Sequence, residues 1–172
     1  FSFDFKVAST PSIQSQLVNG ARTNLFTVKT LAHGTNQNSK YRIGISDIKR
    51  AADVAGSDYG SFSIQVRQTG LNDKGLTTDN VLEQFDNLNF NPESTNYFAR
   101  RIGDRYVDID SDGKLTYQGD WDNRSKHIYV SDFTEIANGA IPKVLVPLGH
   151  AAITNPSVCL LYTSDAADDR LS

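Results

Sequence analysis

Apolar and polar side chains alternate with a period of two along several short stretches, the pattern of half-buried β-strands. The clearest case is 60–70, "GSFSIQVRQTG", where Phe62, Ile64 and Val66 alternate with polar residues. Further strands are predicted at 24–32, 40–48, 81–90 and 126–133, although 81–90 also fits a helix. Loops are expected at 33–39 and 70–80, and an edge segment or extended linker at 141–149, which two prolines interrupt.

A helix is predicted at 92–102. Asn91 can cap its beginning, Pro92 suits the first helical position, and Glu93 suits the positive end of the helix dipole. Several apolar residues that follow lie near one helical face. Gly103 can end the helix in the left-handed region.

The stretch "DIDSDGKLTYQG" at 108–119 begins like a calcium-binding loop. Asp108, Asp110 and Asp112 stand at the first, third and fifth positions, and a glycine stands at the sixth. The twelfth position, which needs a bidentate glutamate, is Gly119. Because the ligand that closes the cage is missing, we favour a hairpin turn over a metal site.

A three-residue hairpin loop at 111–113, with Gly113 left-handed, sets a definite register. The facing pairs are then Ile109 with Leu115, Val107 with Tyr117, Asp108 with Thr116, and Asp110 with Lys114. The first two pairs form an apolar face and the last two a polar face. A one-residue slip would expose the whole apolar face, so we expect burial of that face to fix the register.

Residues 159–169, "CLLYTSDAADD", match the translation of a common transposase-type sequencing adaptor. We therefore treat 159–172 as a non-native tail and 1–158 as the domain, and, since the chain starts at Phe1 and contains no Met, we expect a longer natural protein. Without the tail, which carries three acids, one base and the only cysteine, the net charge is −1. A net charge of −1 does not indicate nucleic-acid binding. No apolar run is long enough to cross a bilayer.

Candidate chemistry is sparse. The triplet "HGT" at 33–35 echoes the histidine motif of subtilisin-like proteases, but no serine motif follows it. We expect no catalytic, cofactor or metal site, and hence no enzyme. The basic stretch 99–105 is either a solvated helix end or an ionic contact to a neighbouring subunit, for which the candidates are Arg100, Arg101 and Arg105.

Three stretches share their order and spacing with one protein family. They are "TPSIQSQ…NLFTVKTLAHGTNQNSKYRIGISDIK" at 10–49, "YGSFSIQVRQTG…VLEQFDNLNFNPESTNYFARRIGD" at 59–104 and "GDWDNRSKHIYV" at 119–130. The matching positions are Phe62, Val66, Arg67, Glu83, Phe85, Leu88, Pro92, Ser94, Asn96, Tyr97, Ile102, Gly103, Asp104, Gly119, Asn123, Ser125, Ile128 and Val130. Over most of 1–158 the chain thus resembles part of a contractile tail sheath protein of myovirus-type bacteriophages.

The resemblance implies an α+β fold: a β-rich mixed sheet with hairpins and few helices, similar to the subtilisin-like central region of sheath proteins. It implies a structural subunit of the virion, assembled in the host bacterial cytoplasm as hexameric rings that stack into a helical sheath. Its partners would be other copies, the tail tube and the baseplate, with no direct nucleic-acid contact and no membrane insertion. Contraction of the sheath would drive genome delivery.

The alternative is a carbohydrate- or receptor-binding β-domain of a phage fibre or adhesin. It would need an exposed aromatic platform, which Tyr117 and Trp121 could supply. A Trp121 side chain exposed beside Tyr117 in a groove would favour this alternative, whereas burial of Trp121 against the hairpin would disfavour it.

The terminal arms by which sheath subunits add strands to neighbouring sheets would lie mostly outside 1–158. We therefore predict that residues 1–158 stay monomeric or associate only weakly. Light scattering checks this prediction, and stable hexamers or tubes formed by 1–158 alone would contradict it.

Overall fold

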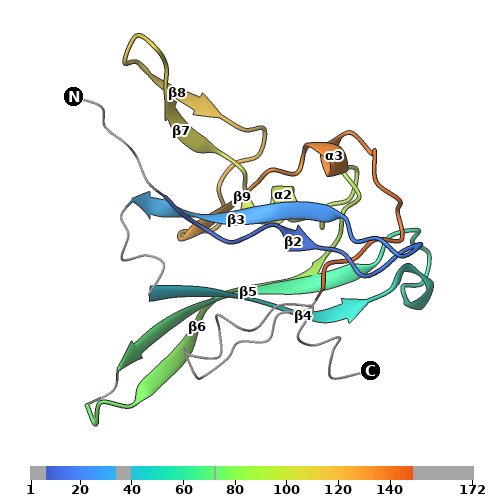
Figure 1. Cartoon of the computed structure of the whole chain (residues 1–172), viewed down its shortest axis with the longest axis horizontal. Helices are drawn as coiled ribbons and strands as arrows, with labels where there is room; N and C mark the ends of the chain where they lie inside the picture. Colours follow the sequence, from blue (N-terminus) through green and yellow to red (C-terminus); the bar gives the residue numbers. More distant parts are fainter. Residues whose placement is uncertain (1–6, 34–39, 72, 149–172) are drawn as a thin grey trace.

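The computed structural model describes residues 7–33, 40–71 and 73–148. In chain order the elements are β1 (Val7–Ser9), β2 (Ile13–Gln14), β3 (Asn24–His33), β4 (Tyr41–Lys49), η1 (Ala51–Asp53), β5 (Ser61–Leu71), β6 (Thr77–Leu88), α2 (Phe98–Ile102), β7 (Tyr106–Ile109), β8 (Leu115–Gln118), β9 (Ile128–Ser131) and α3 (Thr134–Ala137). One antiparallel sheet is built on β3, which pairs with β1, β2 and β9, and a second runs β4–β5–β6 (Figure 1). The predicted β-rich class with few helices is confirmed.

The apolar side chains of β5 form one side of the core. Phe62, Ile64 and Val66 are at most 1% exposed, in the alternation that the sequence predicts. Ile45 of β4 lies opposite Ile64 and is also buried. The predicted strands at 24–32, 40–48 and 60–70 are therefore confirmed as β3, β4 and β5.

The loop predicted at 70–80 is wrong at both ends. β5 continues to Leu71, and β6 begins at Thr77, which faces it. Residues Thr77–Asn80 are exposed or half-exposed, so their pairing needs no apolar face. Ladder hydrogen bonds and the β-propensity of threonine extend the strand beyond the hydrophobic pattern. The strand predicted at 81–90 is confirmed as far as Leu88.

The helix predicted at 92–102 is wrong in its first half, because α2 begins only at Phe98. The Asn91 side chain does accept a hydrogen bond from the backbone N–H of Glu93, at 3.1 Å. That bond belongs to a turn, since Asn side chains compete with helical pairing of the backbone. Gly103 ends α2 with a positive φ of 106° but a ψ of 149°, which is outside the left-handed helical region.

Four phenylalanines connect the two sheets and α2. The ring of Phe26 in β3 lies 6.4 Å from Phe62 in β5 and 5.0 Å from Phe98 in α2. Phe90, which follows β6, lies 5.0 Å from Phe62 and 5.1 Å from Phe98. All four side chains are buried. Because packed aromatic rings bury large areas in definite orientations, this cluster fixes how the layers sit against each other.

β9 is a buried strand, shorter than the predicted 126–133. It pairs with β3, with Val130 opposite Val28, and residues of both parities along it are buried. In the segment 141–149, which was predicted as an edge segment or extended linker, Pro147 forms an isolated β-bridge with Ser15. The N–H of Leu148 also donates to the carbonyl of Gln14 in β2, at 2.9 Å.

The expected non-native tail, 159–172, lies outside the described residues. Among the residues that the structure does describe, no helix is long and apolar enough to cross a membrane.

Burial of the Tyr97 ring raises the pKa of its hydroxyl far above the ordinary value of 10.0, and the carboxylates of Asp104 and Asp120 add to the rise. Above pH 10 the unfolded chain therefore loses a proton that the folded chain keeps. Stability should be undiminished below pH 10.0 and fall as pH rises above it, by about 1.4 kcal/mol per pH unit for one group. Urea unfolding from about pH 8 to about pH 11 measures this slope.

The Tyr97→Phe variant should show a shallower slope, and Tyr117→Phe, at a side chain that is 78% exposed, is the matched control. Burial also raises the pKa of Tyr129, so some slope should remain in Tyr97→Phe. Equal slopes for the native chain and Tyr97→Phe would contradict the prediction.

Candidate subunit-contact surface

The β7–β8 hairpin has the register that the sequence predicts. Val107 faces Tyr117, and Ile109 faces Leu115. The turn is closed by a hydrogen bond from the Asp110 N–H to the carbonyl of Lys114, at 3.0 Å. As predicted, the turn glycine, Gly113, has a left-handed φ of 78°.

The turn aspartates serve the hairpin backbone. Oδ1 of Asp110 accepts hydrogen bonds from the N–H groups of Asp112 (3.0 Å) and Lys114 (2.8 Å), and Oδ1 of Asp108 accepts one from Ile109 (2.9 Å). The expected Asp110–Lys114 contact is thus made through the lysine backbone. Within the described ranges, no three His, Cys, Asp or Glu side chains are grouped so that they could hold a metal ion.

The apolar face of this hairpin is exposed, contrary to the expectation that burial fixes its register. Val107 is 45%, Leu115 58% and Tyr117 78% exposed, while Ile109 is half-buried. The hairpin extends away from both sheets, at the upper left of Figure 1. Turn geometry and ladder bonds therefore set the register here. We call the side chains of Val107, Ile109, Leu115 and Tyr117 the apolar hairpin face.

The base of the hairpin is held by Asn123. Its Oδ1 accepts the N–H of Arg105 at 3.0 Å, and its Nδ2 donates to the carbonyl of Arg105 at 2.6 Å, as a paired strand would. Asn123 also sits against Gly103, where a Cβ would come within 2.4 Å of the Asn123 Cα. These hydrogen bonds and this close packing hold together the segments that enter and leave the hairpin.

A second contact connects this base to the β4–β5–β6 sheet. The buried hydroxyl of Ser125 donates to Oε2 of Glu83 in β6 at 2.5 Å, and Oε1 of Glu83 accepts the Lys126 N–H at 2.8 Å. The Ser125 hydroxyl also accepts the N–H of Ile128, the first residue of β9, at 3.1 Å. Both sheets therefore hold the segment that supports the hairpin.

A stacked tyrosine pair lies where the hairpin leaves the body. The ring of Tyr106 in β7 is parallel, within 17°, to that of the buried Tyr129 in β9, at 5.7 Å. Tyr106 lies on the polar side of β7, opposite in parity to Val107. The stack therefore orients the hairpin while leaving its apolar face free.

The three arginines proposed from sequence all have partners within the chain. Nη1 of Arg101 donates to Asn96 Oδ1 at 3.0 Å, and the guanidinium of Arg100 lies over the Trp121 ring at 5.8 Å. Arg105 forms an ion pair with Asp122 while its side chain stays 48% exposed. Of the three, Arg105 lies at the hairpin base, where its backbone pairs with Asn123, and a role for the three arginines in subunit contact stays a prediction.

The alternative function needs an aromatic platform, but its two candidate residues, Tyr117 and Trp121, lie in different surroundings. Trp121 is half-buried and packs edge-to-face on Tyr97 at 5.8 Å, whereas Tyr117 projects from the hairpin. Within the described residues, the Trp121 ring contacts the ring of Tyr97 and the guanidinium of Arg100. This arrangement supplies no shared aromatic groove.

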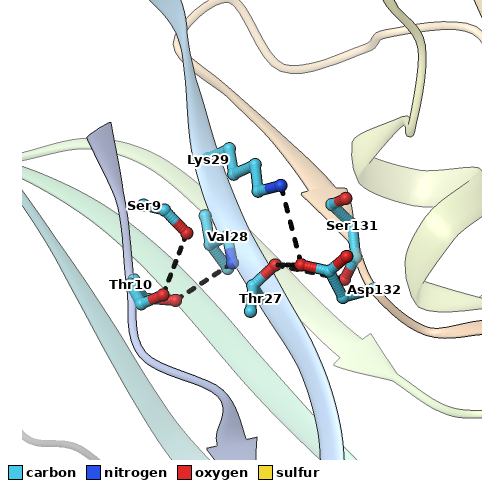
Figure 2. A network of polar contacts seen from close by, with 7 residues as sticks. All are labelled: Ser9, Thr10, Thr27, Val28, Lys29, Ser131 and Asp132. Atoms are coloured by element: carbon cyan, nitrogen blue, oxygen red, sulfur yellow. Dashed lines mark hydrogen bonds and ion pairs between the residues drawn. The ribbon is translucent and has the colours of Figure 1, made fainter. Parts of the chain in front are cut away.

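One polar network resembles a nucleophile with charged neighbours (Figure 2). The Thr27 hydroxyl donates to Asp132 Oδ2 at 2.7 Å, and Lys29 Nζ lies 3.6 Å from the same oxygen. The Asp132 side chain is 59% exposed, so water screens both charges. Asp132 has a φ of 55°, and these contacts hold that conformation at the end of β9, which is a structural role.

A polar depression of about 550 Å³ lies between the turns at 56–59, 91–93 and 137–143. Its Lys143 ammonium is placed over the Tyr59 ring at 5.6 Å and 3.7 Å from an Asp58 carboxylate oxygen. The Lys143 ammonium thus contacts both Tyr59 and Asp58 within this depression.

Comparisons with protein-family models, with curated proteins and with solved structures find no match for this chain. The sequence resemblance to sheath proteins therefore supports a proposal only. Sequence reasoning missed the exposure of the apolar hairpin face, because alternation does not say whether an apolar face meets the core or solvent.

Replacement of Gly103 by alanine should destabilise the fold by about 3 kcal/mol or more, since the new Cβ meets the Asn123 backbone at a positive φ. Gly113→Ala is the matched control. It also has a positive φ, yet nothing lies within 4 Å, so about 1–2 kcal/mol is expected. Urea unfolding measures both, and equal losses would contradict the locked hairpin base.

Proposed function

We propose that this chain is part of a structural subunit of a phage contractile tail sheath. Copies would polymerise around the tail tube, contact the baseplate, and contract to drive genome delivery as part of the virion. The sequence resemblance motivates the proposal. The apolar hairpin face carries it, because a projecting surface of Val, Leu and Tyr side chains suits contact with another protein.

The positions that match the family's motifs support the same reading. Glu83, Gly103, Asn123 and Ser125 hold the hairpin and join it to the sheets. None of these contacts is a proton relay or a ligand site. These contacts keep the projecting β7–β8 hairpin in one orientation. A fixed projecting element suits a protein that functions in an assembly.

Electron microscopy of the product of the complete open reading frame tests the proposal. We expect hollow cylinders of stacked rings, in an extended and a contracted form. Leu115→Asp with Tyr117→Asp should abolish the cylinders, since charges on this face oppose its burial. Gln118→Asp, on the opposite face of β8, is the control that should retain them. A folded product that stays monomeric beside assembled tail tubes would refute the proposal.

A further inference from the structure

The β7–β8 hairpin is a two-stranded sheet, so each of its strands has one edge without a neighbouring strand. Asp110 donates its N–H to the carbonyl of Lys114, which makes this facing pair hydrogen-bonded. Hydrogen-bonded and non-hydrogen-bonded pairs alternate along an antiparallel ladder. Every second residue of each strand therefore points its N–H and C=O away from the hairpin. On β8 these outward residues are Leu115 and Tyr117.

The two edges of the hairpin differ in what covers them. At the β7 edge, the Asn123 side chain pairs with both backbone groups of Arg105, and the Asp108 carboxylate accepts the outward N–H of Ile109 at 2.9 Å. At the β8 edge, the outward N–H and C=O groups form no hydrogen bond within the described ranges. The β8 edge is therefore open to a further strand.

β8 also lacks the features that keep exposed edges from pairing, which are β-bulges, proline and charged side chains. β4 and β6 form the edges of the second sheet, and the pairing of each with β5 is interrupted by register shifts. β7 and β8 pair without any shift, and the sequence of β8, LTYQ, contains neither proline nor charge. The hairpin stands clear of both sheets in Figure 1, so another chain can reach this edge.

We propose that β8 of one copy pairs antiparallel with β8 of a second copy about a two-fold axis. One register uses every open group: Leu115 lies opposite Tyr117 of the second copy, and Thr116 lies opposite Thr116 of the second copy on the axis. Each of the two outward residues in each of the two copies then donates one hydrogen bond, which makes four. The two hairpins become one four-stranded sheet.

The side chains on both faces suit this register. On the apolar hairpin face, Leu115 of each copy lies beside Tyr117 of the other. On the opposite face, the two Thr116 side chains meet on the axis, and Lys114 lies opposite Gln118. Aromatic–aliphatic and Thr–Thr pairs stabilise neighbouring strands, whereas like charges directly opposite each other destabilise them. No like charges lie opposite each other in this register.

A second copy suits this edge better than an extended peptide does. β8 is already held extended by β7, with hydrogen bonds at the Asp110 turn and at Asn123. Its pairing therefore loses little conformational entropy, whereas a free peptide has to be ordered first. The contact is small, so we expect weak, concentration-dependent dimers. It is independent of the proposed function, because a two-fold contact closes after two copies and builds no polymer.

Sedimentation velocity of the full chain over a range of concentrations tests the pairing. Tyr117→Pro removes an outward N–H, which an edge strand tolerates, and should weaken dimerisation about tenfold or more because two of the four bonds are lost. Val107→Pro is the matched control, since it removes an outward N–H from the β7 edge, and it should dimerise as the native chain does. Tyr117→Ala keeps the N–H and should dimerise more tightly than Tyr117→Pro.

Disulfide cross-linking tests the register. Cys159, the only cysteine, is first replaced by serine. Thr116→Cys then places two thiols on the axis in a non-hydrogen-bonded pair, where Cα atoms about 4.5 Å apart are within disulfide reach. Oxidised glutathione should convert this variant to a covalent dimer. Lys114→Cys is the control and should cross-link far less, because its two Cα atoms lie roughly 14 Å apart along the strands.

No association of the native chain, native-like dimers of Tyr117→Pro, or an equal loss in Val107→Pro would each overturn this contact. Equal cross-linking of Lys114→Cys and Thr116→Cys would overturn the register, and the proposal with it. The absence of cylinders from the complete product would refute the proposed function and leave this contact standing.

Discussion

The packing of Phe26, Phe62, Phe90 and Phe98 sets the spacing between the two sheets, and the projecting hairpin depends on it. Phe98 is the first residue of α2, so the ring cluster fixes where that short helix starts. α2 ends at Gly103, and Asn123 lies close against the backbone of this glycine. A helix of five residues has little stability of its own, so α2 depends on the packing of the buried Phe98 ring.

Polar contacts add to the phenylalanine packing in holding the two sheets together. Glu83 and Ser125 lie far apart in the chain, and their partly buried hydrogen bond joins β6 to the segment just before β9. Removing Glu83 would leave the O–H donor of the buried Ser125 without its acceptor, and an unmet buried donor costs more than one hydrogen bond contributes. These residues belong to the motifs that resemble sheath proteins. A likeness at such positions concerns the geometry of the fold, and it carries no catalytic meaning by itself.

Sequence reasoning succeeded where one local rule decides the outcome. The alternation around Ile64 gave β5, and the glycine of the turn gave the register of β7–β8. It failed where distant contacts decide. Thr77–Asn80 became strand because β5 pairs with it, and 92–97 stayed out of the helix because local side-chain bonds compete with helical pairing. The apolar hairpin face was predicted correctly as a face and wrongly as buried, since period-two alternation is the same against a core or a partner.

An exposed apolar face is costly for a monomer unless something covers it part of the time. In the β7–β8 hairpin, the face is held by bonds at both of its ends, at the Asp110 turn and at Asn123. Docking a preformed face loses little conformational entropy, so a small contact can still form. A small contact also separates easily, and repetition along a polymer makes many such contacts strong together. Contacts that are individually weak and jointly strong are what an assembly needs if its subunits are to re-dock as rigid bodies between two arrangements.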